Sequence, residues 1–428
     1  MKLLPQEFYG GDTFGGRPRQ PVIEGGAGPF FFLECRAFHD RPIDTELHRF
    51  DYIARLNHNP PQMRRPSTLS EIPTPALIVE VAILDRNIQR MAAFFAAGPC
   101  RLRPHFKAHK TPEIARRQLA AGSCVGLTCA TVSEAEIVAG LCDDILIANE
   151  MVGPGKCERV AKLAERHTVT IAVDSVAGLE QLAEAARRDG APVGVLVDVN
   201  VGQTRCGVLP GEPALALARR VADTPGVRLR GVMGYEGHLQ PLRERSERET
   251  RAREAMRALV DTAQLLRNNG LPCDVVSGGG TGTYDISGRV PGVTEIQAGS
   301  YALMDSDYGS LHLPFEQAFF LLGTVVSRPD AGRCVADCGH KAATKDHGNP
   351  VVDGIEGATV VMFNDEHAAI ALPPGSTIAV GDRVRLRPSH TDPTMNLHDV
   401  VYALEDERVV DIWPIAARGY PEHRAFVI

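Results

Sequence analysis

Residues 193–222 read VGVLVDVNVGQTRCGVLPGEPALALARRVA, and this stretch contains the unit from which most of the chain is built. The run 193–199 is rich in valine and predicts a buried strand. The segment 213–222 has apolar residues at helical spacing and predicts an amphipathic helix. Glycines between the two predict a loop. The stretch therefore predicts one strand–loop–helix unit of an α/β protein.

The same alternation continues on both sides of this unit. Further apolar runs occur at 102–108, 125–131, 145–150, 169–174, 229–236, 275–280 and 295–303. Amphipathic segments separate them at 111–121, 132–139, 155–166, 177–188 and 245–268. About eight such units in some 200 residues is the count and size of a TIM barrel. A doubly wound parallel sheet shows the same alternation, so the number of units is what favours the barrel.

The pattern of apolar residues and turn formers changes at both ends of the barrel region. Beyond residue 310, short runs such as LLGTVVSRP (321–329) predict a mostly antiparallel β domain over 311–428. We expect the barrel domain to span 67–310, with a strand in PALIVEVA (75–82) near its start. Residues 1–66 are dense in turn formers and predict an irregular extension. An alternative is a misassigned start codon, with translation beginning at Met63.

Composition excludes several classes of function. The net charge of −7 argues against a nucleic-acid-binding or anionic-membrane-binding protein, which needs a basic surface. No stretch approaches the ~20 apolar residues of a membrane span, and Met1–Leu4 does not begin a signal peptide. Ten cysteines without a CxxC pair indicate reduced thiols. We therefore expect a cytoplasmic protein.

The first barrel strand ends in RPHFKAHK (103–110), which carries a candidate catalytic lysine. Active sites of TIM barrels lie at the C-terminal ends of the strands. A lysine with apolar neighbours there loses its proton more readily and can attack an aldehyde. On a continuing strand, Lys107 points to the same side as Arg103 and His105, whereas Lys110 does not. The alternative is that both lysines are solvated loop charges.

A glycine-rich run, SGGGTGT (277–283), follows the seventh predicted strand. Backbone N–H groups of such a run can approach an anion closely, and TIM barrels often bind phosphate after strands seven and eight. The eighth strand ends near Gly299, Ser300 and Tyr301. We therefore expect a phosphate site that includes these three residues with Gly280 and Thr281. A flexible turn is the alternative, and no GK[ST] follows to make a Walker loop.

Three further motifs carry polar side chains. GQTRCG (202–207) follows strand five, and GYEGH (234–238) follows strand six. In the β domain, SHTDPT (389–394) places His390 and Asp392 two residues apart, on one face if the segment is a strand. Histidine with a carboxylate suits Mg²⁺, Mn²⁺ or Zn²⁺. A turn before Pro393 is the alternative.

Taken together, these motifs resemble a known family. RPHFKAHKT, TVSEAE, GQTRCG, GYEGH, SGGGTG, GSYALMD, DEH and SHTDPT occur in that order from about residue 70 onwards. The set resembles the D-threonine aldolase/D-serine dehydratase-like family of fold-type III pyridoxal-phosphate (PLP) enzymes. The resemblance implies an alanine-racemase-like barrel with a β domain, a homodimer and a small D-amino acid as the substrate.

The resemblance also implies roles for individual residues. Lys107 would bind PLP, Arg205 would meet its pyridine nitrogen, and Tyr235 would line the pocket. Thr281, Gly299 and Ser300 would hold the phosphate. His390 and Asp392 match the metal pair, whose second member is cysteine in dehydratases and aspartate in aldolases. Some aldolases, including those for hydroxyaspartate, carry glutamine where this chain has Ala130, which puts that contact and that substrate in doubt.

We therefore predict a PLP- and divalent-metal-dependent aldolase that cleaves a D-configured β-hydroxy amino acid to glycine and an aldehyde. The metal would lower the pKa of the β-hydroxyl, and His238 or a metal-bound water would remove its proton. The alternatives are elimination to a 2-oxo acid and ammonia, racemisation, and a barrel protein that carries PLP without catalysis.

Overall fold

The structure, a computed structural model, describes residues 64–420. Residues 1–63, which make up nearly all of the predicted N-terminal extension, lie outside the described residues, as does the proposed alternative start at Met63. In the described part of the chain, no helix has the length and apolar character needed to cross a membrane. All nine cysteines in that part are free thiols, which agrees with the prediction for those nine.

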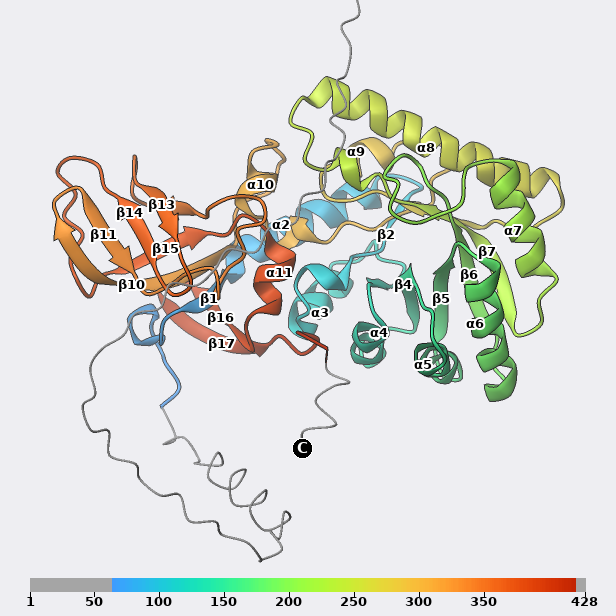
Figure 1. The fold of residues 1–428 in the computed structure, drawn as a ribbon, viewed down its shortest axis with the longest axis horizontal. Helices are drawn as coiled ribbons and strands as arrows, with labels where there is room; N and C mark the ends of the chain where they lie inside the picture. The colour runs from blue at the N-terminus through green and yellow to red at the C-terminus, as the bar shows by residue number, and fades with distance from the viewer. Residues whose placement is uncertain (1–63, 421–428) are drawn as a thin grey trace, which may run out of the picture. The chain divides into compact units, whose positions relative to one another are not determined.

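Eight parallel strands form the barrel in the middle of the chain (Figure 1). They are β2 (Arg101–Leu102), β3 (Leu127–Cys129), β4 (Asp144–Glu150), β5 (Thr168–Val173), β6 (Val193–Asp198), β7 (Val227–Gly234), β8 (Val275–Gly278) and β9 (Glu295–Ile296). The sheet order is β2-β9-β8-β7-β6-β5-β4-β3. Parallel bridges from Leu102 to Cys124 and from His105 to Thr128 join its two ends. The predicted barrel and its strand count are therefore confirmed.

Helices surround these strands on the outside (Figure 1). They are α3 (Pro112–Ala120), α4 (Val132–Val138), α5 (Pro154–Ala164), α6 (Val176–Asp189), α7 (Glu212–Ala222), α8 (Arg245–Asn268) and α9 (Tyr284–Ser287). Thr131 and Ser175 cap α4 and α6 by accepting a backbone N–H of the first turn. Every residue of β6 is buried, as expected for a strand covered on both faces. This burial explains why the barrel strands read as continuous apolar runs.

A nine-stranded, mostly antiparallel sheet packs beside the barrel. Its strands are β1 (Ala76–Glu80), β10 (Phe319–Asp330), β11 (Arg333–Ala336), β12 (Val351–Asp353), β13 (Thr359–Phe363), β14 (Ala368–Ala371), β15 (Arg383–Arg387), β16 (Val400–Glu405) and β17 (Arg408–Pro414). The N-terminal strand β1 lies inside this sheet, antiparallel to β10 and parallel to β16. The chain therefore starts its described part in the sheet, enters the barrel after α2 (Val81–Ala96), and returns to the sheet at β10.

The barrel and the sheet share one hydrophobic core. Leu77 of β1, Leu102 of β2 and Phe319 of β10 belong to the same buried cluster. The buried amide of Asn87 on α2 donates to the carbonyls of Ala302 and Glu316, which ties the end of the barrel to the start of the sheet. The short helix α11 (Thr391–Asn396) of the sheet region contacts η2 (Phe106–Ala108), at the end of the first barrel strand. This contact forms one wall of the functional site.

Candidate active site

Lys107 lies on the 3₁₀ turn η2 rather than on a strand. We predicted a strand through residue 108, but β2 ends at Leu102, and Pro104 cannot donate to a ladder. His105 is still extended, and its ring nitrogen Nδ1 accepts the backbone N–H of Lys107 at 3.4 Å. The turn nevertheless brings Lys107 to the predicted place, beyond the C-terminal end of the strand.

A cavity of about 430 Å³ opens at the C-terminal ends of the barrel strands. It is lined by residues of the barrel loops and of the sheet region, including Lys107, Arg205, Tyr235, Thr281, Ser300, His390 and Asp392. Its volume falls in the range of small-molecule and cofactor sites. The structure therefore brings together motifs that are spread over almost three hundred residues of sequence.

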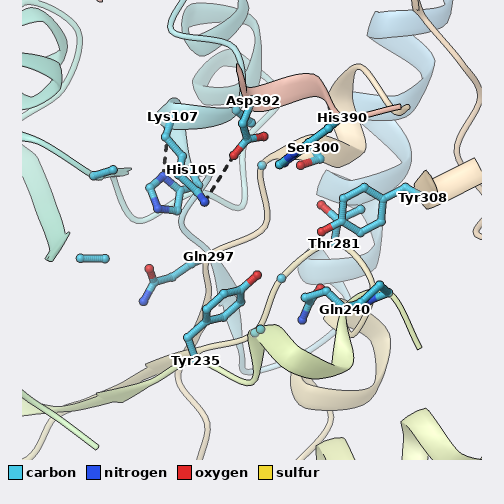
Figure 2. Close-up of a pocket in the computed structure, with 18 of the residues that line it drawn as sticks. His105, Lys107, Tyr235, Gln240, Thr281, Gln297, Ser300, Tyr308, His390 and Asp392 are labelled. Atoms are coloured by element: carbon cyan, nitrogen blue, oxygen red, sulfur yellow. Dashed lines mark hydrogen bonds and ion pairs between the residues drawn. The ribbon is translucent and has the colours of Figure 1, made fainter. Parts of the chain in front are cut away.

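The Lys107 ammonium and the Asp392 carboxylate form an ion pair across this cavity (Figure 2). Nζ lies 3.3 Å from Oδ2. The negative charge of Asp392 raises the pKa of Lys107, which outweighs the effect of burial. For Asp392, burial alone would raise the pKa, but the charges of Lys107 and His390 lower it below its usual value. Burial lowers the pKa of His105 well below its usual range, so this neighbour is a neutral imidazole.

His390 and Asp392 stand at the start of a helix, and neither the strand nor the turn that the sequence left open is found there. His390 is the extended N-cap residue of α11, and Asp392 lies in the first turn of that helix. Pro393 is accommodated because the first turn of a helix does not need its N–H. The other oxygen of Asp392, Oδ1, is buried and has no hydrogen-bond partner among the described residues. A buried acceptor without a donor is the kind of atom that a cation satisfies.

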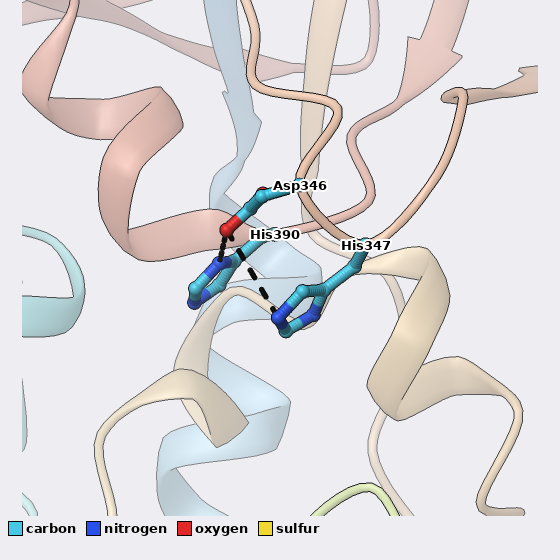
Figure 3. Close-up of side chains that lie close together, drawn as sticks. All are labelled: Asp346, His347 and His390. Carbon is cyan, nitrogen blue, oxygen red and sulfur yellow. Dashed lines mark hydrogen bonds and ion pairs between the residues drawn. The ribbon is translucent and has the colours of Figure 1, made fainter. Parts of the chain in front are cut away.

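A second layer of polar residues supports His390 (Figure 3). Its Nδ1 lies 2.7 Å from Oδ2 of Asp346, and its ring stacks on His347 at a centroid distance of 4.2 Å. His347 Nδ1 in turn lies 3.0 Å from Oδ2 of Asp307. If the Nδ1 of His390 is occupied by a carboxylate, its Nε2 is left to bind a metal. Sequence reasoning missed Asp346, His347 and Asp307. The only signal for Asp346 and His347 was the acidic and histidine content of KDHG (345–348), which does not include Asp307.

The glycine-rich loop follows β8, as predicted, and faces the cavity with part of its length. Gly280, Thr281, Gly299 and Ser300 all line the cavity. Gly299 approaches the backbone so closely that a Cβ there would lie 2.7 Å from the carbonyl oxygen of His105. Only glycine fits this position, and it allows residue 299 to lie against the backbone of His105 while it lines the cavity.

Tyr301 does not line the cavity and instead stabilises the glycine-rich loop from the core. Its backbone N–H donates to Thr281 Oγ1 at 3.0 Å. Its side chain is fully buried, and the hydroxyl accepts from the Gln118 amide at 3.1 Å. The phenol therefore points into the core, and the predicted contact between Tyr301 and a ligand is not supported by this geometry.

Arg205, which follows β6, and Tyr235, which follows β7, lie together in the cavity wall. The Arg205 guanidinium carbon is 5.6 Å from the centre of the Tyr235 ring, in a cation–π arrangement. Burial raises the pKa of Tyr235, which keeps its hydroxyl protonated. Both side chains line the cavity, where the sequence placed them.

The structure does not bring His238 into this cavity. His238 follows β7 on the turn η3 (Gly237–Leu239), but it lines a separate, open groove with Arg251 and Glu254 of α8. Its ring packs against Gly202, where an added Cβ would lie 3.1 Å from it. From this segment, Gly237, Gln240 and Pro241 do reach the cavity. Gln297 and Tyr308 also line the cavity and were not anticipated from the sequence.

Comparison with known proteins gives the family of the chain. Residues 79–307 match the model of the alanine racemase N-terminal domain, and residues 318–404 match a putative serine dehydratase domain. A D-threonine aldolase of Arthrobacter sp. is 42% identical over 367 residues, which cover 84% of this chain and 97% of the relative.

Solved structures give the same result. The crystal structure of D-threonine aldolase from Filomicrobium marinum is 40% identical, with a TM-score of 0.81 over 83% of this chain and 98% of that one. D-threo-3-hydroxyaspartate dehydratase from Delftia sp. HT23 is 31% identical, with a TM-score of 0.75 over 82% and 99%. The chain therefore belongs to the D-threonine aldolase/D-serine dehydratase-like family of fold-type III pyridoxal-phosphate enzymes.

Proposed function

We propose that the protein is a PLP- and divalent-metal-dependent aldolase that cleaves D-configured β-hydroxy amino acids, such as D-threonine, to glycine and an aldehyde. The observation that carries the proposal is the ion pair between Lys107 and Asp392. It places the amine that would bind the cofactor beside a carboxylate whose second oxygen has no partner among the described residues. A candidate metal ligand in contact with the amine that would bind the cofactor favours metal-assisted cleavage of a β-hydroxy amino acid.

The cavity residues fit PLP in size and in chemistry. Lys107 supplies the amine for its aldehyde, and Thr281, Gly299 and Ser300 supply donors for its phosphate at another part of the cavity. Arg205 supplies a permanent cation for the pyridine nitrogen. When bound, PLP withdraws electrons from the α-carbon of an attached amino acid, and a cation at the pyridine nitrogen moderates this withdrawal.

The sheet region fits a divalent metal. His390 Nε2 and Asp392 Oδ1 would hold it, because Asp346 occupies the other ring nitrogen and Oδ1 is buried without a donor among the described residues. A divalent cation at this point would lower the pKa of a β-hydroxyl and favour loss of its proton. We propose Mn²⁺, Mg²⁺ or Zn²⁺, all of which accept such ligands.

The chain's own residues then orient the substrate and exclude water. Tyr235 and Arg205 enclose one side of the cavity, and His347 with Tyr308 encloses the side next to His390. Lys107 would hold the cofactor aldehyde, and its ion pair with Asp392 keeps the amine at this place in the cavity. His238 is left out of this account, because it lines another groove.

Elimination is the second candidate, because the Delftia relative is named a dehydratase. The carboxylate at position 392 favours the aldolase, since cysteine is typical of the dehydratases at this position. Racemisation would need a second base opposite Lys107, and a barrel protein that only carries PLP would not need His390, Asp392 or the β domain.

Product analysis tests the proposal. D-Threonine should give glycine and acetaldehyde in equal amounts, the activity should be lost after chelation, and Mn²⁺ should restore it. 2-Oxobutanoate with ammonia would show elimination instead, and cleavage that persists in chelator would contradict the role of the metal. A panel of D-β-hydroxy amino acids would then define the side chain beyond Cβ.

The assembly that we propose is a homodimer in the cytoplasm. Sedimentation velocity tests the first part, and a monomer at micromolar concentration would contradict it.

A further inference from the structure

We propose that Glu236, together with Gln240, is a positioning residue that sets the conformation of the phosphate-binding loop. The inference rests on the proposed function, because it takes the loop 277–283 to hold the phosphate of PLP. Both residues lie in the segment after β7, next to His238, which does not reach the cavity. They act on the loop after β8 from the neighbouring strand.

Glu236 is fully buried and accepts three hydrogen bonds from the loop and the short helix behind it. The Gly279 N–H donates to Oε2 at 3.2 Å. The hydroxyls of Thr283 and Ser287 each donate to Oε1 at 2.7 Å. A buried carboxylate costs free energy unless its oxygens accept hydrogen bonds. The three hydrogen bonds to Glu236 therefore hold Gly279, Thr283 and Ser287 in one arrangement.

Gln240 holds the next part of the loop. Its Oε1 accepts the Gly282 N–H at 2.8 Å, and its Nε2 donates to Thr283 Oγ1 at 2.9 Å. The amide also packs directly on Gly280, where an added Cβ would lie 2.7 Å from Oε1. The Gly280 N–H is bound within the loop, to Thr283 Oγ1 at 3.3 Å. Figure 2 shows Gln240 and Thr281 on the same side of the cavity.

These contacts divide the backbone donors into two groups. The N–H groups of Gly279, Gly280 and Gly282 are bound to Glu236, Thr283 and Gln240, and are not free to meet an anion. Within residues 64–420, the N–H groups of Thr281, Gly299 and Ser300 have no such acceptor, and all three residues line the cavity. The glycines therefore serve to pack the loop on Glu236 and Gln240, and the anion site is presented by the other three residues.

Affinity for the phosphate distinguishes a positioning role from a general structural role. PLP and pyridoxal carry the same aldehyde, and pyridoxal lacks the phosphate, so binding of each can be measured by its absorbance near 420 nm. Glu236→Ala should weaken PLP binding by roughly tenfold or more, the size of a lost hydrogen bond to a charged group. Pyridoxal binding should change by less than about twofold. Glu236→Gln should recover part of the loss, because its amide oxygen still accepts hydrogen bonds.

Glu295→Gln is the matched control. Glu295 is a buried carboxylate of the adjacent strand β9. Its side chain pairs with Arg103 at 2.9 Å, and only its backbone pairs with the start of the loop segment, at Ser277. The Glu295→Gln variant should leave the ratio of PLP to pyridoxal affinity unchanged. If Glu236→Ala does not fold, Glu236→Gln and Ser287→Ala must still lower that ratio. The inference is overturned if the ratio of PLP to pyridoxal affinity is unchanged in both variants, or if both aldehydes lose affinity by the same factor. Failure of the proposed function has a different signature, because it shows in the products that the wild-type protein forms from D-threonine and not in the ratio of PLP to pyridoxal affinity.

Discussion

Lys107 Nζ and Asp392 Oδ2 lie 3.3 Å apart. Lys107 belongs to the turn η2, which follows the first barrel strand, whereas Asp392 belongs to the helix α11 of the sheet region. The shared core between β1, β2 and β10 fixes this distance, because it holds the two parts together behind the site. The geometry therefore couples the amine proposed to bind the cofactor to the candidate metal ligand, and both parts of the chain line one cavity.

Metal affinity should depend on Asp346 as well as on the two ligands. Asp346→Asn should lower the affinity for Mn²⁺ by about 10–100-fold, because its carboxylate fixes the ring nitrogen of His390. Titration calorimetry with Mn²⁺ measures this. Asp365→Asn is the control, since the exposed Asp365 pairs with the half-buried His340 at 2.6 Å elsewhere in the same sheet region. Equal affinities for the two variants would contradict the role of Asp346.

Arg205 should control the type of reaction. Arg205→Glu would replace the permanent cation with a group that favours a protonated pyridine nitrogen. The variant should therefore cleave D-threonine more slowly and show a larger share of racemised or transaminated product, measured by chiral chromatography. Arg251→Glu, outside the cavity, should leave the product distribution unchanged. The prediction fails if Arg205→Glu slows every reaction by the same factor.

Loss of the His238 side chain should have little effect. His238→Ala should change kcat/KM by less than about twofold, as is usual for side chains outside a site. His390→Ala, in the cavity, should reduce it by more than about a hundredfold. Steady-state kinetics with D-threonine would decide, and a large loss in His238→Ala would show that the groove beside α8 takes part in the reaction.

Protein stability should fall with rising pH because of Asp198. Burial, together with the adjacent Glu150 carboxylate, raises the pKa of Asp198 to about 8. Because the folded state holds this proton more tightly than the unfolded chain, the contribution is full below about pH 4 and is lost by about pH 8. Asp198→Asn removes this dependence, so its free energy of unfolding relative to wild type should rise by at least about 1 kcal/mol from pH 5 to pH 8.

Urea titrations at the two pH values measure this difference. Asp143→Asn, whose side chain is 96% exposed, is the matched control and should show no such rise. A constant difference between Asp198→Asn and wild type would contradict the placement of the Asp198 proton.

The sequence predicted the barrel because strands such as β6 are buried on both faces and therefore read as apolar runs. The order of loops after β6, β7 and β8 followed from the strand count, which placed Arg205, Tyr235 and Thr281 at one end of the barrel. The family motifs added His390 and Asp392. These parts were accessible because they depend on local patterns or on the order of elements.

Other parts depended on contacts between distant residues. A five-residue apolar strand such as β1 has no local feature that selects β10 and β16 as its partners. Asp346 meets His390 through tertiary packing, and no spacing rule links them. His238 and Gln240 are two residues apart on one turn, yet only Gln240 reaches the cavity. Their side-chain directions are set by the turn η3, which the sequence did not reveal.

The most direct test of the account is to reduce the PLP-loaded protein with borohydride and map the labelled peptide by mass spectrometry. One pyridoxyl group is expected, on Lys107, and no label is expected in Lys107→Ala. Lys110→Ala should be labelled like wild type, because Lys110 Nζ pairs with the buried Glu134 at 3.3 Å and lies outside the cavity. A label on Lys110, or an unchanged yield of label in Lys107→Ala, would contradict the central claim.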